Sequence, residues 1–158
     1  MKSSAQEEKL QYKRELKALC ISMLKERIEA ARQAMNSAQE SANSEEKSSA
    51  GDKYETGRAM SQRERDNYAA RLEETQMEMN LLQGIDADKI YETVDNGAVM
   101  KCGDSVYFIA TGVGIVTFAD HKVAVLSPKS PFATAMRDKK VGEKVIFAGK
   151  DFLISEVF

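Results

Sequence analysis

The stretch N-S-E-E-K-S-S-A-G-D-K-Y-E-T-G-R-A-M, residues 43–60, decides the fold because it separates two long helical patterns. Its serine-rich first half interrupts the apolar spacing and predicts a turn. Two helices that are joined by a short loop are usually antiparallel neighbours, so the stretch predicts the tip of a helical hairpin. Asp52 and Glu55 stand where the second helix is expected to begin, and their spacing places both carboxylates on one face of a helical turn.

The two predicted helices cover residues 4–42 and 53–83, and both are rich in strong helix formers such as Glu, Lys, Gln and Ala. Apolar residues alternate spacings of three and four, strongly in the first helix and more weakly in the second, as in a coiled coil. This seam consists of Ile21, Leu24, Ile28, Ala31, Met35, Ala38 and Ala42 in the first helix, and of Tyr68, Leu72, Thr75, Met79 and Leu82 in the second. We therefore expect residues 1–84 to form an antiparallel coiled-coil hairpin with its tip near residues 43–56.

The pattern changes to a period of two after residue 84. Short strands are predicted at residues 98–100, 105–110, 114–118, 123–126, 144–148 and 152–158. Ser130 followed by Pro131 predicts the start of one helix, because serine is a favoured N-cap and proline fits the first helical position. The chain is thus expected to be an α+β protein, in which residues 85–158 form a small antiparallel β domain with one helix.

Composition excludes several classes of function. The net charge of −2 argues against a general duplex-DNA binder, which needs a basic surface. No run of 18 apolar residues and no apolar leader occur, so we expect no membrane association and a cytoplasmic location. Cys20 and Cys102 match no disulfide or metal spacing, and His121 is the only histidine. No complete set of catalytic groups is present, so a free-standing enzyme is not expected.

The residues of the tip allow two interpretations from spacing alone. Asp52 at the N-cap with Glu55 three residues later is a variant of the capping box, which is the commoner role for such a pair. The same carboxylates at the end of a slender rod are also a candidate metal-binding pair. Tyr54 is able to stack on a base or to pack across the tip, and Arg58 to contact RNA phosphate or to lie on a solvated face.

The order of these parts resembles the bacterial Gre family of transcript cleavage factors over nearly the full length. The first match is Gly51-Asp52-Lys53-Tyr54-Glu55 at the tip. The second is S-P-F-A-T-A-M at residues 130–136, followed by K-V-G-E at residues 140–143, which is similar to the family's helix and the following turn. The closing strand F-L-I-S-E-V-F at residues 152–158 also fits the family pattern.

This resemblance implies an FKBP-like C-terminal domain that binds bacterial RNA polymerase, with Ser130, Pro131 and Phe132 as partner-binding residues. It further implies that the hairpin enters the secondary channel of the polymerase and reaches the 3′ end of the nascent RNA. There Asp52 and Glu55 would help to hold a Mg²⁺ jointly with the polymerase, because two carboxylates alone do not complete the octahedral oxygen shell of this ion. The protein would then be a monomeric auxiliary factor that stimulates the polymerase's own nuclease activity.

Two alternative functions remain open at this point. Thr56-Gly57-Arg58-Ala59 departs from the family pattern after Glu55, so one alternative is a regulator that occupies the same channel without stimulating cleavage. The other is a dimeric coiled-coil adaptor whose β domain binds peptides.

Overall fold

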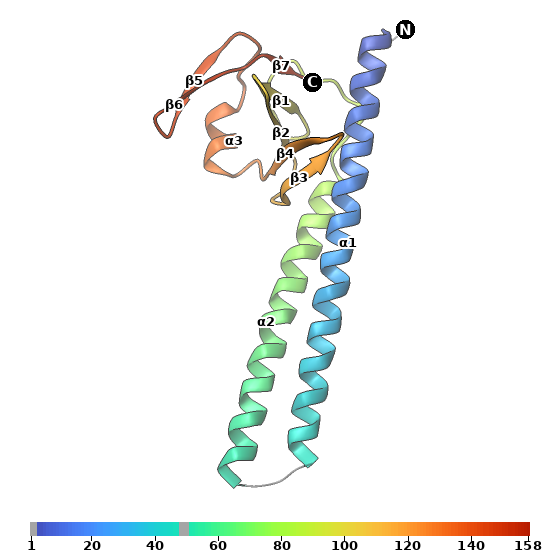
Figure 1. The fold of residues 1–158 in the computed structure, drawn as a ribbon, viewed down its shortest axis with the longest axis vertical. Coiled ribbons are helices and arrows are strands. Elements are labelled where there is room, and N and C mark those ends of the chain that lie inside the picture. The colour runs from blue at the N-terminus through green and yellow to red at the C-terminus, as the bar shows by residue number, and fades with distance from the viewer. Residues whose placement is uncertain (1–2, 48–50) are drawn as a thin grey trace. The chain divides into compact units, whose positions relative to one another are not determined.

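The computed structural model describes residues 3–47 and 51–158, and the side chains of residues 3–44 and 56–158. It divides the chain into two compact units. We call Met23–Met79 the hairpin unit, and Met1–Ser22 together with Asn80–Phe158 the β unit. The fold is α+β, with two long helices that precede a small, mostly antiparallel β region (Figure 1).

The two long helices are α1 (Ser4–Lys47) and α2 (Gly51–Gln83). Helix α1 begins with a capping box, in which Ser3 Oγ accepts from the Gln6 amide and Gln6 Oε1 accepts from the Ser3 amide, both at 3.2 Å. Helix α1 continues to Lys47, beyond the end predicted near residue 42, and α2 begins at Gly51, slightly before the start predicted near residue 53. Helix formation requires backbone hydrogen bonds rather than an apolar seam, and the Glu and Lys residues that follow the seam are strong helix formers.

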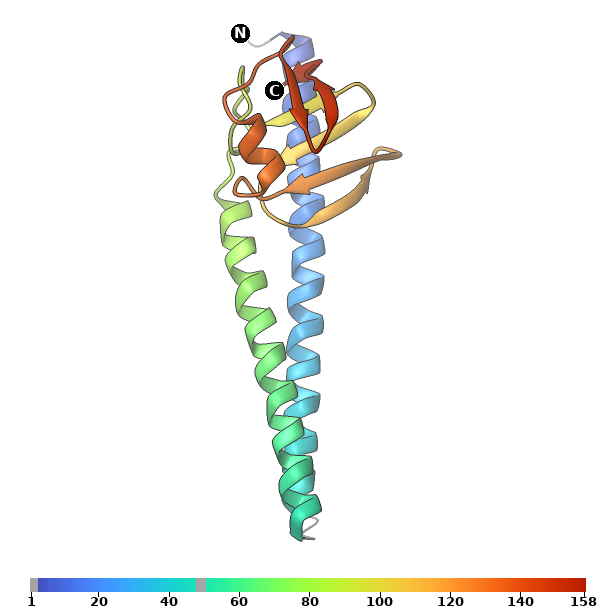
Figure 2. The same cartoon turned by 90° about the vertical axis from the view of Figure 1, so that its left-hand side faces the viewer.

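Within the hairpin unit, α1 and α2 run side by side in opposite directions, as two perpendicular views show (Figures 1 and 2). The seam positions predicted from the sequence are buried or half-buried on both helices. Leu24, Ala38, Ala42 and Met79 are the buried hydrophobic side chains among those described in this unit. The packed surface between the helices is therefore a narrow stripe, and it consists partly of alanine.

The β unit contains a five-stranded sheet with the order β3-β4-β2-β1-β7 and a separate two-stranded sheet, β5-β6. The strands of the larger sheet are β1 (Val99–Cys102), β2 (Ser105–Ile109), β3 (Gly114–Phe118), β4 (His121–Leu126) and β7 (Glu156–Val157), and the smaller sheet consists of β5 (Lys144–Phe147) and β6 (Lys150–Leu153). The prediction of a purely antiparallel domain is wrong for one pair, because β2 and β4 are parallel. The chain turns after β3 at Ala119 and Asp120, which have φ angles of 51° and 62°, and β4 then returns between β3 and β2.

Helix α3 (Pro131–Met136) contributes two buried side chains to the core of the β unit. Its Ala133 and Met136 are buried in a cluster with side chains from the strands and loops, namely Val94, Ala98, Met100, Ile109, Ile154 and Val157. The N-terminal part of α1 also packs in this unit, since the Tyr12 ring lies 4.9 Å from that of Phe118 and 5.8 Å from that of Phe158. Within the described residues, no helix is both long enough and apolar enough to cross a bilayer.

Candidate functional site

The end of the hairpin is the first candidate site, because the sequence places two carboxylates there. Asp52, Tyr54 and Glu55 lie within the first turns of α2, but their side chains are outside the described part of the chain. Since α2 begins at Gly51, Asp52 is inside the first helical turn rather than at the predicted N-cap. The prediction that the two carboxylates share one face of the helix therefore lies outside the described side chains.

Arginine side chains follow this end along α2. Arg58 and Arg63 are exposed and Arg65 is half-buried, with Arg65 Nη1 3.3 Å from Asp66 Oδ1. Arg71 is exposed and its Cζ lies 5.7 Å from the centre of the Tyr68 ring. Guanidinium groups bind phosphate well, so this helix carries groups suited to an RNA backbone. Among these arginines, Arg58 is nearest to the carboxylate pair in sequence, and its role as an RNA or channel contact stays a prediction.

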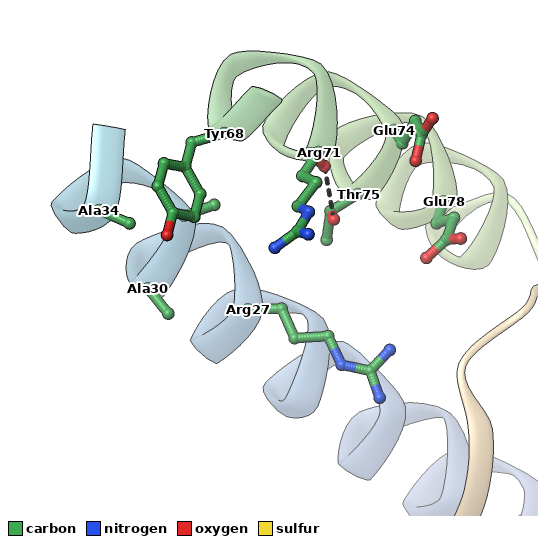
Figure 3. A pocket seen from close by; sticks show the side chains of 9 residues that line it. Arg27, Ala30, Ala34, Tyr68, Arg71, Glu74, Thr75 and Glu78 are labelled. Carbon is green, nitrogen blue, oxygen red and sulfur yellow. Dashed lines mark hydrogen bonds between the residues drawn. The ribbon is translucent and has the colours of Figure 1, made fainter. Parts of the chain in front are cut away.

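A hollow of about 450 Å³ lies between the two helices of the hairpin unit (Figure 3). Its α1 side is formed largely by alanines, and its α2 side by polar and aromatic residues; the lining residues are Arg27, Ala30, Ala31, Ala34, Tyr68, Arg71, Glu74, Thr75 and Glu78. Thr75 Oγ1 donates to the Arg71 carbonyl oxygen at 2.8 Å, and the Arg71 side chain extends into the space between the helices. The hollow therefore arises because alanine side chains do not fill the space opposite α2.

Charges in this hollow are balanced rather than of one sign. Burial raises the pKa of the Glu78 carboxyl, the nearby Arg27 guanidinium acts to lower it, and Glu74 acts to raise it. Within residues 3–44 and 56–158, no group of three or more His, Cys, Asp or Glu side chains is arranged to hold a metal ion. Asp52 and Glu55, the predicted Mg²⁺ ligands, are not among those residues.

The three residues predicted to bind a partner lie at the start of α3. Ser130 is its N-cap, with Oγ accepting from the Ala133 amide at 3.3 Å, and Pro131 is exposed at the first helical position. Phe132 is half-buried, and its ring centre lies 4.8 to 5.3 Å from those of three other rings, which belong to Tyr107, Phe147 and Phe152. The structure thus brings the three residues together, and it gives Ser130 and Phe132 structural contacts as well.

Sequence reasoning missed a buried lysine in the β unit. Lys13 on α1 is 0% exposed, and its Nζ donates to the Lys89 carbonyl oxygen at 2.7 Å. Nζ also lies 4.5 Å from the centre of the Tyr91 ring, and Lys89 Nζ lies 4.7 Å from the same centre. We call Lys13, Lys89 and Tyr91 the Lys13 cluster. The sequence did contain a signal for this burial. Lys13 stands three residues after Leu10 and seven before Cys20, so it lies on the same face of the helix as these two apolar residues, which are both buried.

Comparisons with known proteins do not assign the chain. No model of a known protein family matches it. No curated protein matches it either.

Proposed function

We propose that this chain is a Gre-like elongation factor, which binds bacterial RNA polymerase and delivers Asp52 and Glu55 through the secondary channel to backtracked RNA. The observation that carries this proposal is the position of the motif Gly51-Asp52-Lys53-Tyr54-Glu55 at the start of α2, where the chain reverses between two long helices. The α1 arm of the hairpin unit has 25 helical residues and the α2 arm has 29, so the arms are about 37 Å and 43 Å long. An arm of that length and slender cross-section suits entry into a channel.

The proposal includes a coiled-coil hairpin and an FKBP-like C-terminal domain. Coiled-coil packing of the hairpin is supported by the alternation of three and four between its less exposed positions. An FKBP-like fold of the C-terminal region is supported by a small sheet with one short helix packed on it. The surface around Ser130, Pro131 and Phe132 is the proposed contact with the polymerase, with exposed Pro131 as its most accessible member.

The chemistry assigned to the tip is positioning and not nucleophilic attack. Mg²⁺ prefers six oxygen ligands and retains water readily, so Asp52 and Glu55 suit a metal whose other ligands come from the polymerase. A metal held in this way activates water and stabilises the charge that develops on phosphate during hydrolysis. Arg58 and Tyr54 would then contact the displaced RNA through its phosphate and a base. The chain acts as a monomeric auxiliary factor in the bacterial cytoplasm.

Cleavage of halted, backtracked elongation complexes in the presence of Mg²⁺ tests this proposal. We expect the parent protein to release short 3′ fragments, and Asp52→Asn and Glu55→Gln to lower the rate by roughly 100-fold, the order seen when one group that stabilises a transition state is removed. Asp66→Asn, on the exposed surface of the same helix, is the matched control and should cleave like the parent. All four proteins should compete equally for polymerase, so that lost chemistry is separated from lost binding.

A second candidate function is favoured by Thr56-Gly57-Arg58-Ala59, which departs from the Gre pattern immediately after the carboxylates. In that case the protein binds the same channel and changes transcription without releasing fragments. The same assay distinguishes the two, because a parent protein that competes for polymerase but cleaves no RNA establishes the non-cleaving regulator. Failure to bind polymerase, together with a stable dimer in sedimentation, would instead support the adaptor.

A further inference from the structure

The surroundings of Lys13 provide few hydrogen-bond acceptors for an ammonium group. An ammonium has three N–H donors, and the described structure offers Lys13 one acceptor, the Lys89 carbonyl oxygen. Lys13 forms no ion pair within the described residues, and the Tyr91 ring on which it lies is shared with the second ammonium of Lys89. A neutral amine needs fewer acceptors and avoids repulsion from Lys89, so the neutral form suits this site better.

We propose that the Lys13 cluster is a pH-dependent clamp, in which a neutral Lys13 holds residues 84–96 on the N-terminal part of α1 more firmly than a protonated Lys13 does. The contact joins parts of the chain that are 76 residues apart in sequence. Lys17 adds two hydrogen bonds from the same helix, to the carbonyl oxygens of Gln83 and Ile85, and Arg14 an ion pair to Asp88. Protonation of Lys13 therefore acts on the attachment of the whole segment that leads from α2 to the sheet.

The neighbouring charges have opposing effects on Lys13. Burial lowers the pKa of Lys13 to about 8, Asp86 acts to raise it, and Lys89 acts to lower it further. The other titratable groups in this segment are Asp88, Tyr91, Glu92 and Asp95, and Arg14 and Lys17 bond to it from α1. Burial of the Tyr91 ring raises the pKa of its phenol, and Asp95 and Asp86 act in the same direction, so Tyr91 stays neutral near pH 8, where folded Lys13 loses its proton.

The sign of the pH effect follows from this lowered pKa. Between pH 8 and the ordinary lysine value of 10.5, unfolded Lys13 binds a proton that folded Lys13 does not. Attachment of the segment therefore strengthens as the pH rises through this window, and it is constant below it. From pH 7 to pH 9 the expected gain is about tenfold in the closing equilibrium, since one pH unit above the folded pKa changes the ratio by about that factor.

The direct test is an NMR titration of the lysine side chains in the full chain, with the Lys13 signal assigned by its absence in Lys13→Met. We expect Lys13 to titrate near pH 8. A Lys13 midpoint at or above 10 would overturn the proposal. If the variant fails to fold, connecting the side-chain signals to the assigned backbone of the parent protein identifies Lys13, so the titration still decides the question.

The clamp itself is tested by hydrogen exchange of the amides in residues 85–94, expressed as protection factors so that the intrinsic pH dependence of exchange is removed. In the parent, protection should rise about tenfold from pH 7 to pH 9, because Lys13 loses its proton in that interval. Lys13→Met, which keeps an unbranched side chain without a charge, should show no such rise. Lys25→Met on the exposed face of the same helix is the matched control and should behave like the parent.

Equal pH dependence in the parent and Lys13→Met would refute the clamp. The pKa of the Cys102 thiol is also raised by burial, and its titration contributes equally to both proteins and cancels in the comparison. These experiments use the isolated protein. Their outcome is independent of whether the chain binds RNA polymerase.

Discussion

The hairpin unit and the β unit are stabilised in different ways. In the β unit, side chains as large as Phe108, Met100 and Met136 are 0% exposed. In the hairpin unit, two of the buried hydrophobic side chains are alanines, and a hollow of about 450 Å³ remains between its helices. Long helices that share a narrow seam depend largely on helix propensity and marginal packing, whereas a filled core gives cooperative stability. The β unit is therefore expected to resist unfolding more strongly than the hairpin unit.

Replacing one methionine by alanine in each unit tests this difference, and it is the prediction with the largest expected change in the free energy of unfolding. Met136→Ala removes a fully buried side chain from the core of the β unit and should lower the free energy of unfolding by roughly 2–5 kcal/mol. Met35→Ala removes a half-buried seam residue of α1 and should cost less than about half of that, since less area leaves water on folding. Urea denaturation with residue-resolved hydrogen exchange reports the two units separately.

Equal losses for the two methionine variants would show that the hairpin unit is packed as tightly as the β unit. A larger loss for Met35→Ala would reverse the comparison. The loss of stability must be measured for each unit separately, because a chain with two compact units need not unfold in a single step.

Local patterns account for the parts of the fold that the sequence predicts well. The seam positions of both helices and the start of α3 depend on neighbours within a few residues, through helical periodicity and through the Ser130-Pro131 cap. The extra turns beyond the seam were missed because an apolar pattern marks where a helix is packed, and Glu and Lys extend a helix without it. The parallel pairing of β2 and β4 was missed because strand order depends on the path of the connection and not on alternation within each strand.

Long-range contacts explain what the sequence did not predict at the candidate sites. The acceptor for Lys13 is a carbonyl oxygen on a segment remote in sequence, and backbone acceptors leave no residue signature. Phe132 was predicted as a partner contact, but its aromatic neighbours come from β2, β5 and β6 and become visible only in the fold. For Asp52, Tyr54 and Glu55 the roles at the tip stay predictions that the cleavage assay tests.

Glycine substitutions sharpen the comparison, because the two units are expected to respond with opposite signs. Gly97 has a φ of 100°, and a Cβ added there would lie 2.6 Å from Tyr91 Oη. Gly97→Ala should therefore destabilise the β unit by roughly 2–3 kcal/mol, through a strained backbone and a displaced Tyr91 ring. Gly57→Ala within α2 should stabilise the hairpin unit by about 0.5–1 kcal/mol, because alanine is the better helix former.

Gly114→Ala separates the two causes at Gly97. Gly114 has a φ of 99°, close to that of Gly97, and a Cβ added there meets no atom within 4 Å, so this variant tests the backbone cost alone. In a thermal melt, Gly97→Ala should lose more stability than Gly114→Ala, and adding Tyr91→Phe should recover part of the difference. If the two glycine variants lose equally, the contact with Tyr91 contributes nothing. A destabilised Gly57→Ala would reveal a close approach between the helices at that position.

The smallest expected effect comes from two serine caps that lie on helices of very different length. Ser130 caps the six-residue α3, whose Ala133 and Met136 are part of the core. Ser130→Ala should cost about 1 kcal/mol, because the Ala133 amide loses its acceptor in a helix that the sheet needs for packing. Ser3→Ala removes the cap of the 44-residue α1, and only its first exposed turn should fray.

Denaturation midpoints measured under identical conditions compare these two caps, and Ser130→Asp, which restores an acceptor, serves as the control for α3. Ser130→Asp should recover most of the lost stability, while Ser3→Ala should stay within about 0.5 kcal/mol of the parent, as is usual for exposed positions. If Ser3→Ala costs as much as Ser130→Ala, the first turn of α1 is an integral part of the β unit, and the core of that unit extends further along this helix than the buried side chains indicate.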